Sequence, residues 1–189
     1  PWTIVGLSLG LGMSTHMAVL FLVPFVVLGR QVHWRGLAVG LCVGLAPYVM
    51  IPLRGPWPQP WGDLRTLAGW VEYVSARMYW GNAFALPLAD WPARVLAWSS
   101  LMARQFTPLG ALIAMAGAAR ARSAWRERVR GGAISFVLAS LYAIGYNAPD
   151  SWVYLVALLP LMAVSVGDGI GWLVDQAGLT SAVSSAIGL

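Results

Sequence analysis

Long apolar runs without a charged side chain, separated by short arginine-bearing loops, constrain this chain more than any other feature. The first run, residues 2–29, contains no Asp, Glu, Lys or Arg. A helix of roughly 20 mostly apolar residues crosses the hydrocarbon core of a bilayer. The runs therefore predict an all-α membrane protein, a polytopic bundle of about five transmembrane helices that forms one domain over residues 1–189, with spans at about 2–29, 36–53, 92–119, 131–147 and 152–174.

The composition excludes several classes of soluble protein. Of 189 residues, 59% are hydrophobic and 10% are charged, and the mean hydropathy is +0.70. An average soluble domain is about 25% charged. So few charges cannot cover a water-soluble globule, which excludes a soluble enzyme, a nucleic-acid-binding domain and a disordered chain. We also interpret the chain, which opens at Pro1 and not at Met, as an internal fragment of a longer membrane protein.

The arginines predict the orientation in the membrane. The loop at 30–35 carries two arginines and the loop at 120–130 carries five. Cytoplasmic loops are enriched in Lys and Arg, so both loops are expected on the cytoplasmic side of a bacterial-type plasma membrane. The segment 54–91 and the turn at 147–151 are then expected to face outward. The net charge of +5 thus reflects topology, and no nucleic-acid partner is expected.

The outward segment is the expected place for chemistry, because it concentrates tryptophan and proline. Asp63 is either the cap of a short interfacial helix from Leu64 to about Met78 or a site carboxylate. Trp61 and its neighbours are either an aromatic belt at the headgroup level or a platform for stacking on a sugar or lining a lipid headgroup. Arg54, Arg65 and Arg77 either snorkel to the interface or bind a phosphate.

Two further polar positions are candidates. His16 lies about halfway along the first predicted span, beside Ser14 and Thr15. A polar cluster inside a span is a functional-site hypothesis by default, and the alternative is a hydrogen bond to a neighbouring helix. Asp150 is either a helix cap or a site carboxylate. No metal site is expected, because the chain has two histidines without zinc spacing, and the lone Cys42 has no disulfide partner in the chain.

Three stretches of the sequence carry recognisable motifs, and the most specific of them is Pro52-Leu53-Arg54, Trp61-Gly62-Asp63, Val74-Ser75 and Tyr79. These motifs resemble those of the domain of unknown function 2723 family. Residues 6–10 with Thr15-His16 resemble the family's glycine- and histidine-bearing span. Residues 146–150 with Tyr154 and Pro160 resemble its later outward turn. Pro60 departs from the pattern, which has Asn before Trp-Gly.

This family is similar to, and includes, protein O-mannosyltransferases of the GT-C glycosyltransferase class. The resemblance implies transfer of a sugar such as mannose from a polyprenyl-phosphate donor to an outward-facing acceptor, such as a protein Ser or Thr or a glycan. It implies donor- or substrate-binding roles for Arg54, Trp61, Asp63, Arg77, Tyr79, His16 and Asp150. It also places the catalytic acid in a first outward loop, upstream of Pro1, so the fragment alone is expected to be inactive. No cofactor is expected, and nothing in the sequence supports a divalent cation.

Two other classes remain open. A transporter or lipid-flipping module is suggested by His16 and Pro24 in one span and Pro108 in another, because transporters place polar sites in interrupted helices. A non-catalytic membrane scaffold that docks a partner through the outward segment is the third reading.

Overall fold

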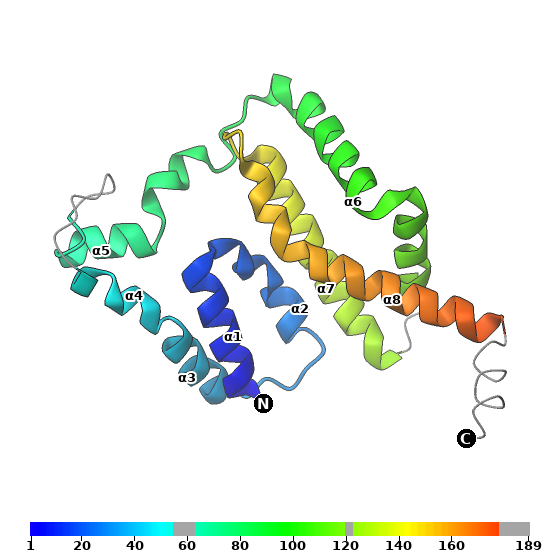
Figure 1. Ribbon diagram of the computed structural model, residues 1–189, viewed down its shortest axis with the longest axis horizontal. Coiled ribbons are helices and arrows are strands. Elements are labelled where there is room, and N and C mark those ends of the chain that lie inside the picture. Colours follow the sequence, from blue (N-terminus) through cyan, green and yellow to red (C-terminus); the bar gives the residue numbers. More distant parts are fainter. Residues whose placement is uncertain (55–62, 120–122, 178–189) are drawn as a thin grey trace.

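The predicted all-α fold is confirmed. The computed structural model describes residues 1–54, 63–119 and 123–177, and those residues form helices without a strand (Figure 1). The α-helices are α1 (Trp2–Thr15), α2 (Val23–Val27), α3 (Trp34–Gly44), α4 (Ala46–Met50), α5 (Leu67–Val74), α6 (Trp91–Ala119), α7 (Ser123–Gly145) and α8 (Leu159–Gln176). The 3-10 helices are η1 (Met17–Leu22), η2 (Pro52–Arg54), η3 (Arg77–Asn82), η4 (Leu88–Asp90) and η5 (Ser151–Leu158).

One continuous helical segment of the described chain is long and apolar enough to cross a membrane. This segment, Ser151–Gln176, has 26 residues and joins η5 to α8. It contains the span predicted at 152–174. Three shorter apolar helical segments precede it in the chain: Trp2–Thr15, Met17–Val27 and Trp34–Met50.

The first predicted span, residues 2–29, is wrong as a single crossing, because the chain reverses direction at His16. His16 has an extended backbone (φ −157°, ψ 124°), and its Nδ1 accepts a hydrogen bond from the Ala18 backbone N–H at 3.1 Å. The hydroxyls of Ser14 and Thr15 donate to the carbonyls of Leu11 and Gly12 at 2.8 and 2.7 Å. These bonds satisfy backbone groups that a helix end leaves open, so a helical hairpin replaces the predicted span (Figure 1).

The hairpin brings α3 alongside α1, and the two helices run in the same direction. Gly40 lies against the backbone of Thr3 and Leu7, and Gly44 lies against Leu7 and Gly10. A Cβ atom at Gly44 would lie 2.5 Å from the Leu7 carbonyl oxygen and 2.8 Å from the Gly10 Cα. The glycines spaced four residues apart therefore let the two backbones touch, as expected for helix packing in lipid.

The second and third predicted spans are interrupted. The second, 36–53, divides into α3, α4 and η2, and Pro47 lies in the first turn of α4. The third lies in α6, where Thr107 has φ 57° and ψ 158° and precedes Pro108. The Thr107 hydroxyl accepts a hydrogen bond from Gly110 N–H at 3.1 Å, so it caps a second helix within α6.

Helices α6, α7 and α8 form the other half of the fold (Figure 1). The fully buried core consists of Ala139 and Ala143 on α7 with Leu155 and Leu158 on η5. Near the carboxyl-terminal end of α6, Gly117 lies against the backbone of Ser165 and Gly169 on α8. The predicted fourth span, 131–147, lies mostly within α7, which begins earlier, at Ser123.

The outward segment holds a shorter helix than predicted. Helix α5 begins at Leu67 and ends at Val74, because Ala76 adopts a left-handed conformation (φ 54°) before η3. Trp70 anchors α5 to α4 by donating its indole N–H to the Tyr48 carbonyl at 2.8 Å. Tyr48 in turn donates its hydroxyl to the Met13 carbonyl near the end of α1 at 2.9 Å.

Candidate functional site

A cluster of one histidine and three tyrosines lies where the hairpin meets α7 and η5. We call His16, Tyr142, Tyr146 and Tyr154 the histidine–tyrosine cluster. The ring of Tyr154 lies at its centre, 5.5 Å from His16, 4.8 Å from Tyr142 and 4.9 Å from Tyr146 between ring centroids. Those three contacts are edge-to-face, an arrangement that stabilises aromatic pairs by about 0.5–1.5 kcal/mol beyond the area they bury. The cluster thus joins the hairpin to the later part of the chain.

The end of the outward segment lies on this cluster. The Asn147 N–H donates to the Asn82 carbonyl at 2.9 Å, and the Leu86 N–H donates to the Gly145 carbonyl at 3.2 Å. Phe84, whose φ is 53°, contacts the ring of Tyr142 edge-on at 5.8 Å. Residues 82–86 therefore pair with the chain that leaves α7, and they connect the outward segment to the turn at 147–150.

Arg94 holds that turn from the side of α6. Its guanidinium donates to the Ala148 carbonyl at 3.2 Å and to the Ser151 Oγ at 2.5 Å. The same group lies 5.3 Å from the ring centroid of Trp152, within the range of a cation–π contact. Arg94 was not among the residues singled out from the sequence. Its place near the start of a predicted span, opposite an outward turn rich in carbonyls, could have indicated this anchoring role.

His16 is the predicted site residue that the cluster includes, and its tautomer follows from its cap. Because Nδ1 accepts the Ala18 N–H, the ring proton lies on Nε2. Nε2–H is then a hydrogen-bond donor at the apex of the hairpin. The tyrosine hydroxyls add groups that both donate and accept, and the cluster contains no carboxylate for acid–base catalysis.

Asp150 is the exposed residue directly before η5. It occupies the N-cap position, as one interpretation predicted, but its side chain makes no capping hydrogen bond. The carboxylate lies four residues before Tyr154 in the chain, at the amino-terminal end of the same helical segment. It is therefore available to a ligand that approaches the turn.

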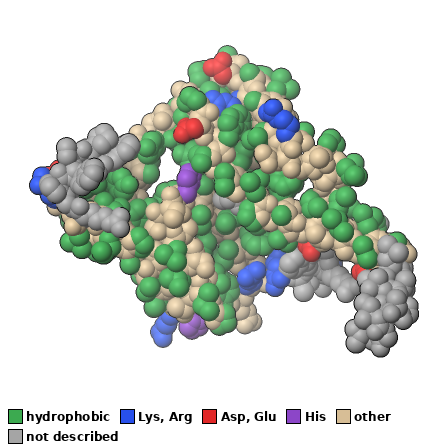
Figure 2. Space-filling view, viewed as in Figure 1, with side chains coloured by type: hydrophobic (Ala, Val, Ile, Leu, Met, Phe, Trp, Pro, Cys, Tyr) green, Lys and Arg blue, Asp and Glu red, His purple; other side chains and the backbone are tan. Residues whose placement is uncertain are grey.

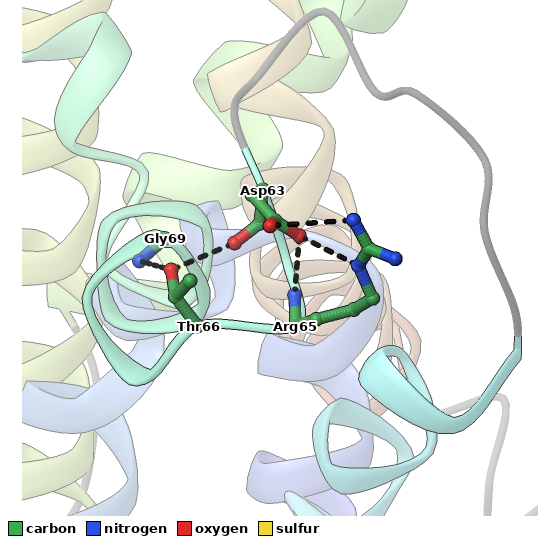
Figure 3. Close-up of polar contacts among 4 residues, drawn as sticks. All are labelled: Asp63, Arg65, Thr66 and Gly69. Carbon is green, nitrogen blue, oxygen red and sulfur yellow. Dashed lines mark hydrogen bonds and ion pairs between the residues drawn. The ribbon is translucent and has the colours of Figure 1, made fainter.

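Asp63 does not cap a helix with its side chain, so the predicted cap is corrected. Asp63 accepts hydrogen bonds from the backbone N–H and the Nε of Arg65 at 3.1 and 3.0 Å (Figure 3). The cap is Thr66, whose Oγ1 accepts from Gly69 N–H at 3.1 Å and donates to the Asp63 carbonyl at 2.9 Å. The hydrogen bonds and charge of Arg65 hold the pKa of the exposed Asp63 carboxyl below its usual value.

The remaining candidates belong to the outward segment. Arg77 lies at the start of η3 and pairs with Glu72 at 3.5 Å, with both side chains largely exposed. Tyr79 is exposed in the same 3-10 helix. Arg54 ends η2, and its side chain is outside the described residues, as is the whole of Trp61. Among the residues described, the structure connects His16 and Asp150 through η5, whereas Asp63 forms a separate local ion pair.

No group of three or more His, Cys, Asp or Glu side chains that could hold a metal ion occurs among the described residues. Comparison of the chain with protein-family models, with curated proteins and with solved structures finds no match in any of the three.

Proposed function

We propose that this chain is the membrane part of a GT-C-like glycosyltransferase, which moves a sugar from a polyprenyl-phosphate donor to an outward-facing acceptor. One observation supports it most: two of the three sequence segments that resemble the domain of unknown function 2723 family meet in space, and the chain that follows the remaining segment reaches the same turn. The first segment meets the third where His16 contacts Tyr154. The second is followed by Asn82, whose carbonyl accepts from Asn147 in the third. Residues distant in sequence thus converge on one outward turn.

The proposal places the chain across the membrane several times. Many large apolar side chains are exposed along α3, α6 and α7, including Val39, Leu112 and Val137. On the face in Figure 2, charged side chains lie mostly near the upper and lower margins, apart from those on the left arm, and hydrophobic side chains cover much of the region between. This distribution suits a bilayer, where a charge at the centre is costly.

The hairpin changes the proposed topology at the amino-terminal end. Helix α1 has 14 residues, which is about 21 Å of helix and less than the hydrocarbon thickness of about 30 Å. We therefore treat α1 and η1–α2 as a re-entrant pair that enters and leaves on the cytoplasmic side. Gly29 lies against Glu127, so the loop at 28–33 adjoins the arginine-rich start of α7, as the arginine distribution predicts.

The outward arginines are the proposed donor site. Arg54 is the first candidate for binding the donor phosphate, because it follows the second apolar run and precedes the Trp61-Gly62-Asp63 motif. Arg77 can join it: its exposed pair with Glu72 is of a kind worth about 0–1 kcal/mol, and a phosphate binds a guanidinium through two parallel hydrogen bonds. Trp61 and Tyr79 supply aromatic faces for the sugar. Asp150 and the Nε2–H of His16 orient the acceptor.

A transferase assay on the full-length protein in membranes tests this proposal. Transfer of labelled sugar from a polyprenyl-phosphate donor is measured for the wild type, for Arg54→Ala and for Arg35→Ala. Loss of a group that stabilises charge on the leaving phosphate is expected to lower the rate by about 10²- to 10³-fold. Arg35, on the cytoplasmic side, is the control and retains the rate. Full activity of Arg54→Ala would contradict the proposed role of that residue. If the wild-type protein transferred no sugar from the polyprenyl-phosphate donor, the proposal that it is a glycosyltransferase would be refuted.

Cysteine labelling tests the topology separately. In a Cys42→Ser background, single cysteines are introduced at Thr3, Gln31 and Asn147, which are all exposed. A membrane-impermeant maleimide is expected to label Asn147→Cys from outside intact cells and the other two only after the cells are opened. Labelling of Thr3→Cys from outside would restore a single crossing over residues 2–29 and contradict the re-entrant hairpin.

A transporter is the second candidate, and the broken helices favour it. The apolar runs are interrupted at His16 and at Thr107, and transporters bind their substrates at such breaks. Gradient-dependent flux through reconstituted protein, in the absence of sugar transfer, would favour this reading over the transferase. Neither activity would favour the membrane scaffold.

A further inference from the structure

The loop that follows α2 lies against the start of α7, at the opposite end of that helix from the outward turn. A Cβ atom at Gly29 would overlap the side chain of Glu127 and lie 3.4 Å from its Cα. Arg30 directly follows Gly29, and Arg126 directly precedes Glu127. The Cα atoms of the two arginines therefore lie no more than about 13 Å apart, a distance that two extended arginine side chains can bridge.

Neither of these arginines has an anionic partner in the described part of the chain. The Nε of Arg30 is buried, and no acceptor for it occurs among the described residues. Arg126 is exposed and makes no hydrogen bond or ion pair with them. Glu127 is the one acidic residue in the segments 28–35 and 123–130, and it pairs with Arg130 at 2.5 Å. Two guanidinium groups are thus brought together without a counter-charge.

An exposed apolar face of α7 continues from these charges. Ile134, Val137 and Leu141 are all exposed, and they follow Arg126 and Arg130 at the three- and four-residue spacing that places side chains on one side of a helix. A ligand that contacts this side of α7 meets cations at one end and aliphatic side chains beyond them. That order matches a phospholipid, whose phosphate precedes its acyl chains.

The chemistry of the two guanidinium groups specifies the headgroup. A guanidinium donates two parallel N–H bonds to a phosphate, and a buried N–H without an acceptor is unfavourable. In the proposed orientation this end of α7 lies at the cytoplasmic surface, where anionic lipids attract arginines beside membrane helices. A choline headgroup brings a cation of its own toward the arginines, whereas a glycerol headgroup brings none.

We propose that Arg30 and Arg126 together bind the phosphate of an anionic phospholipid of the cytoplasmic leaflet, such as phosphatidylglycerol. Each guanidinium donates to the phosphate oxygens, and the Nε of Arg30 gains the acceptor that it lacks. The acyl chains lie along Ile134, Val137 and Leu141. This inference rests on the proposed membrane placement, but it does not depend on sugar transfer.

The test uses the full-length protein reconstituted in vesicles of equal parts phosphatidylglycerol and phosphatidylcholine. After extraction in mild detergent, the lipid retained on each chain is identified by native mass spectrometry. Each arginine at a membrane surface favours an anionic lipid by about fivefold, so we expect the glycerol lipid to exceed the choline lipid by about 25-fold in the wild type and about fivefold in Arg30→Gln or Arg126→Gln.

Arg35→Gln is the matched control and is expected to keep the wild-type ratio. Arg35 is an exposed arginine of the same loop region, but it lies where the start of α3 packs on α1, because the neighbouring Gly36 contacts Thr3. Arg30→Lys retains the charge and loses the paired N–H donors, so its ratio is expected to fall toward that of Arg30→Gln.

Several results would overturn the proposal. Equal retention of the two lipids by the wild type is one, and an equal loss in Arg35→Gln and Arg30→Gln is another, because it would show only a diffuse attraction. Displacement of the glycerol lipid by excess inorganic phosphate, beyond the effect of sodium chloride at the same ionic strength, would assign the arginines to a free phosphate. Absence of the protein from membranes would refute both this proposal and the membrane placement, which the cysteine labelling tests alone. Loss of the lipid preference with sugar transfer intact would refute the lipid site and leave the transferase standing.

Discussion

The contact between α1 and α3 makes a sharp prediction about Gly44. A Cβ atom there would lie 2.5 Å from the Leu7 carbonyl oxygen and 2.8 Å from both the Gly10 Cα and the Leu11 nitrogen, and all three atoms belong to the backbone. No side chain can rotate away to make room. The closest contact must open to about 3.4 Å before it is ordinary, so Gly44→Ala forces the helices apart along their shared length.

The magnitude follows from a matched control. Gly167 on α8 has nothing within 4 Å of an added Cβ, so Gly167→Ala gains only helix propensity, up to about 1 kcal/mol. Gly44→Ala gains the same propensity but is overpacked, which costs about 1–3 kcal/mol. We therefore expect Gly44→Ala to have a free energy of unfolding about 2 kcal/mol below that of Gly167→Ala, within the range for overpacking.

The assay is equilibrium unfolding of the full-length protein in mixed micelles, followed by circular dichroism as the fraction of denaturing detergent rises. Equal midpoints for Gly44→Ala and Gly167→Ala would refute the close approach of α1 and α3. The double variant Gly10→Ala/Gly44→Ala adds a second check. Because both glycines belong to one contact, the combined loss is expected to be smaller than the sum of the single losses.

Three other perturbations have expected outcomes. Arg94→Met loses two hydrogen bonds at the outward turn; hydrogen bonds to charged groups contribute about 1.5–3 kcal/mol each, so limited proteolysis is expected to cut at residues 147–150 first. Thr107→Gly relieves a backbone conformation that costs about 1–3 kcal/mol for a non-glycine residue, and it is expected to raise the unfolding midpoint. The pKa of Asp63 is lowered by Arg65, so the stability from this pair is present above the ordinary pKa and disappears as the pH falls through the lowered one. A carbon-13 NMR titration of the Asp63 carboxyl is expected to show a higher pKa in Arg65→Met than in the wild type, because the variant loses the side-chain hydrogen bonds and keeps the bond from the backbone N–H of residue 65.

The sequence predicts helix class and position well where an apolar run is continuous. The run at 152–174 lies within one helical segment, Ser151–Gln176, whereas the run at 92–119 lies within α6 but is broken at Thr107. Hydropathy locates such a helix correctly because it measures the apolar content of the segment, which determines whether the segment can be buried. It carries no information on the direction in which the chain runs, and for this reason residues 2–29 were predicted as one crossing and form a hairpin.

The signs of the reversal were nevertheless present in the sequence. Ser14, Thr15 and His16 can bond to nearby backbone groups and so compete with a continuous helix. Proline is tolerated in the first turn of a helix and breaks its interior. Pro24, Pro47 and Pro160 each lie in the first turn of a helical segment. Reading Pro47 as a helix start would have divided the second apolar run correctly, whereas the first run divides at His16, before Pro24.

The candidate site was predicted less completely than the fold, because its contacts join distant segments. His16 was chosen for its polarity within an apolar run, and that reasoning needs no partner. Tyr142 and Arg94 acquire their roles only through contacts with Tyr154 and Ser151, which no local pattern shows. Asp63 was assigned to a cap three residues too early, since Thr66 is an equally good cap residue and the turn before it belongs to the Asp63–Arg65 pair.

The two breaks in the apolar helices connect the fold to the proposed functions. A continuous helix satisfies its own backbone, whereas a break in a bilayer exposes polar groups that cost several kcal/mol each unless protein or water satisfies them. The break at His16 is satisfied by its own side-chain caps and packs against Tyr154. The break at Thr107 is capped by its own hydroxyl. The break at His16 thus lies in the histidine–tyrosine cluster, and an unbroken helix there would remove the surface that the acceptor is proposed to contact.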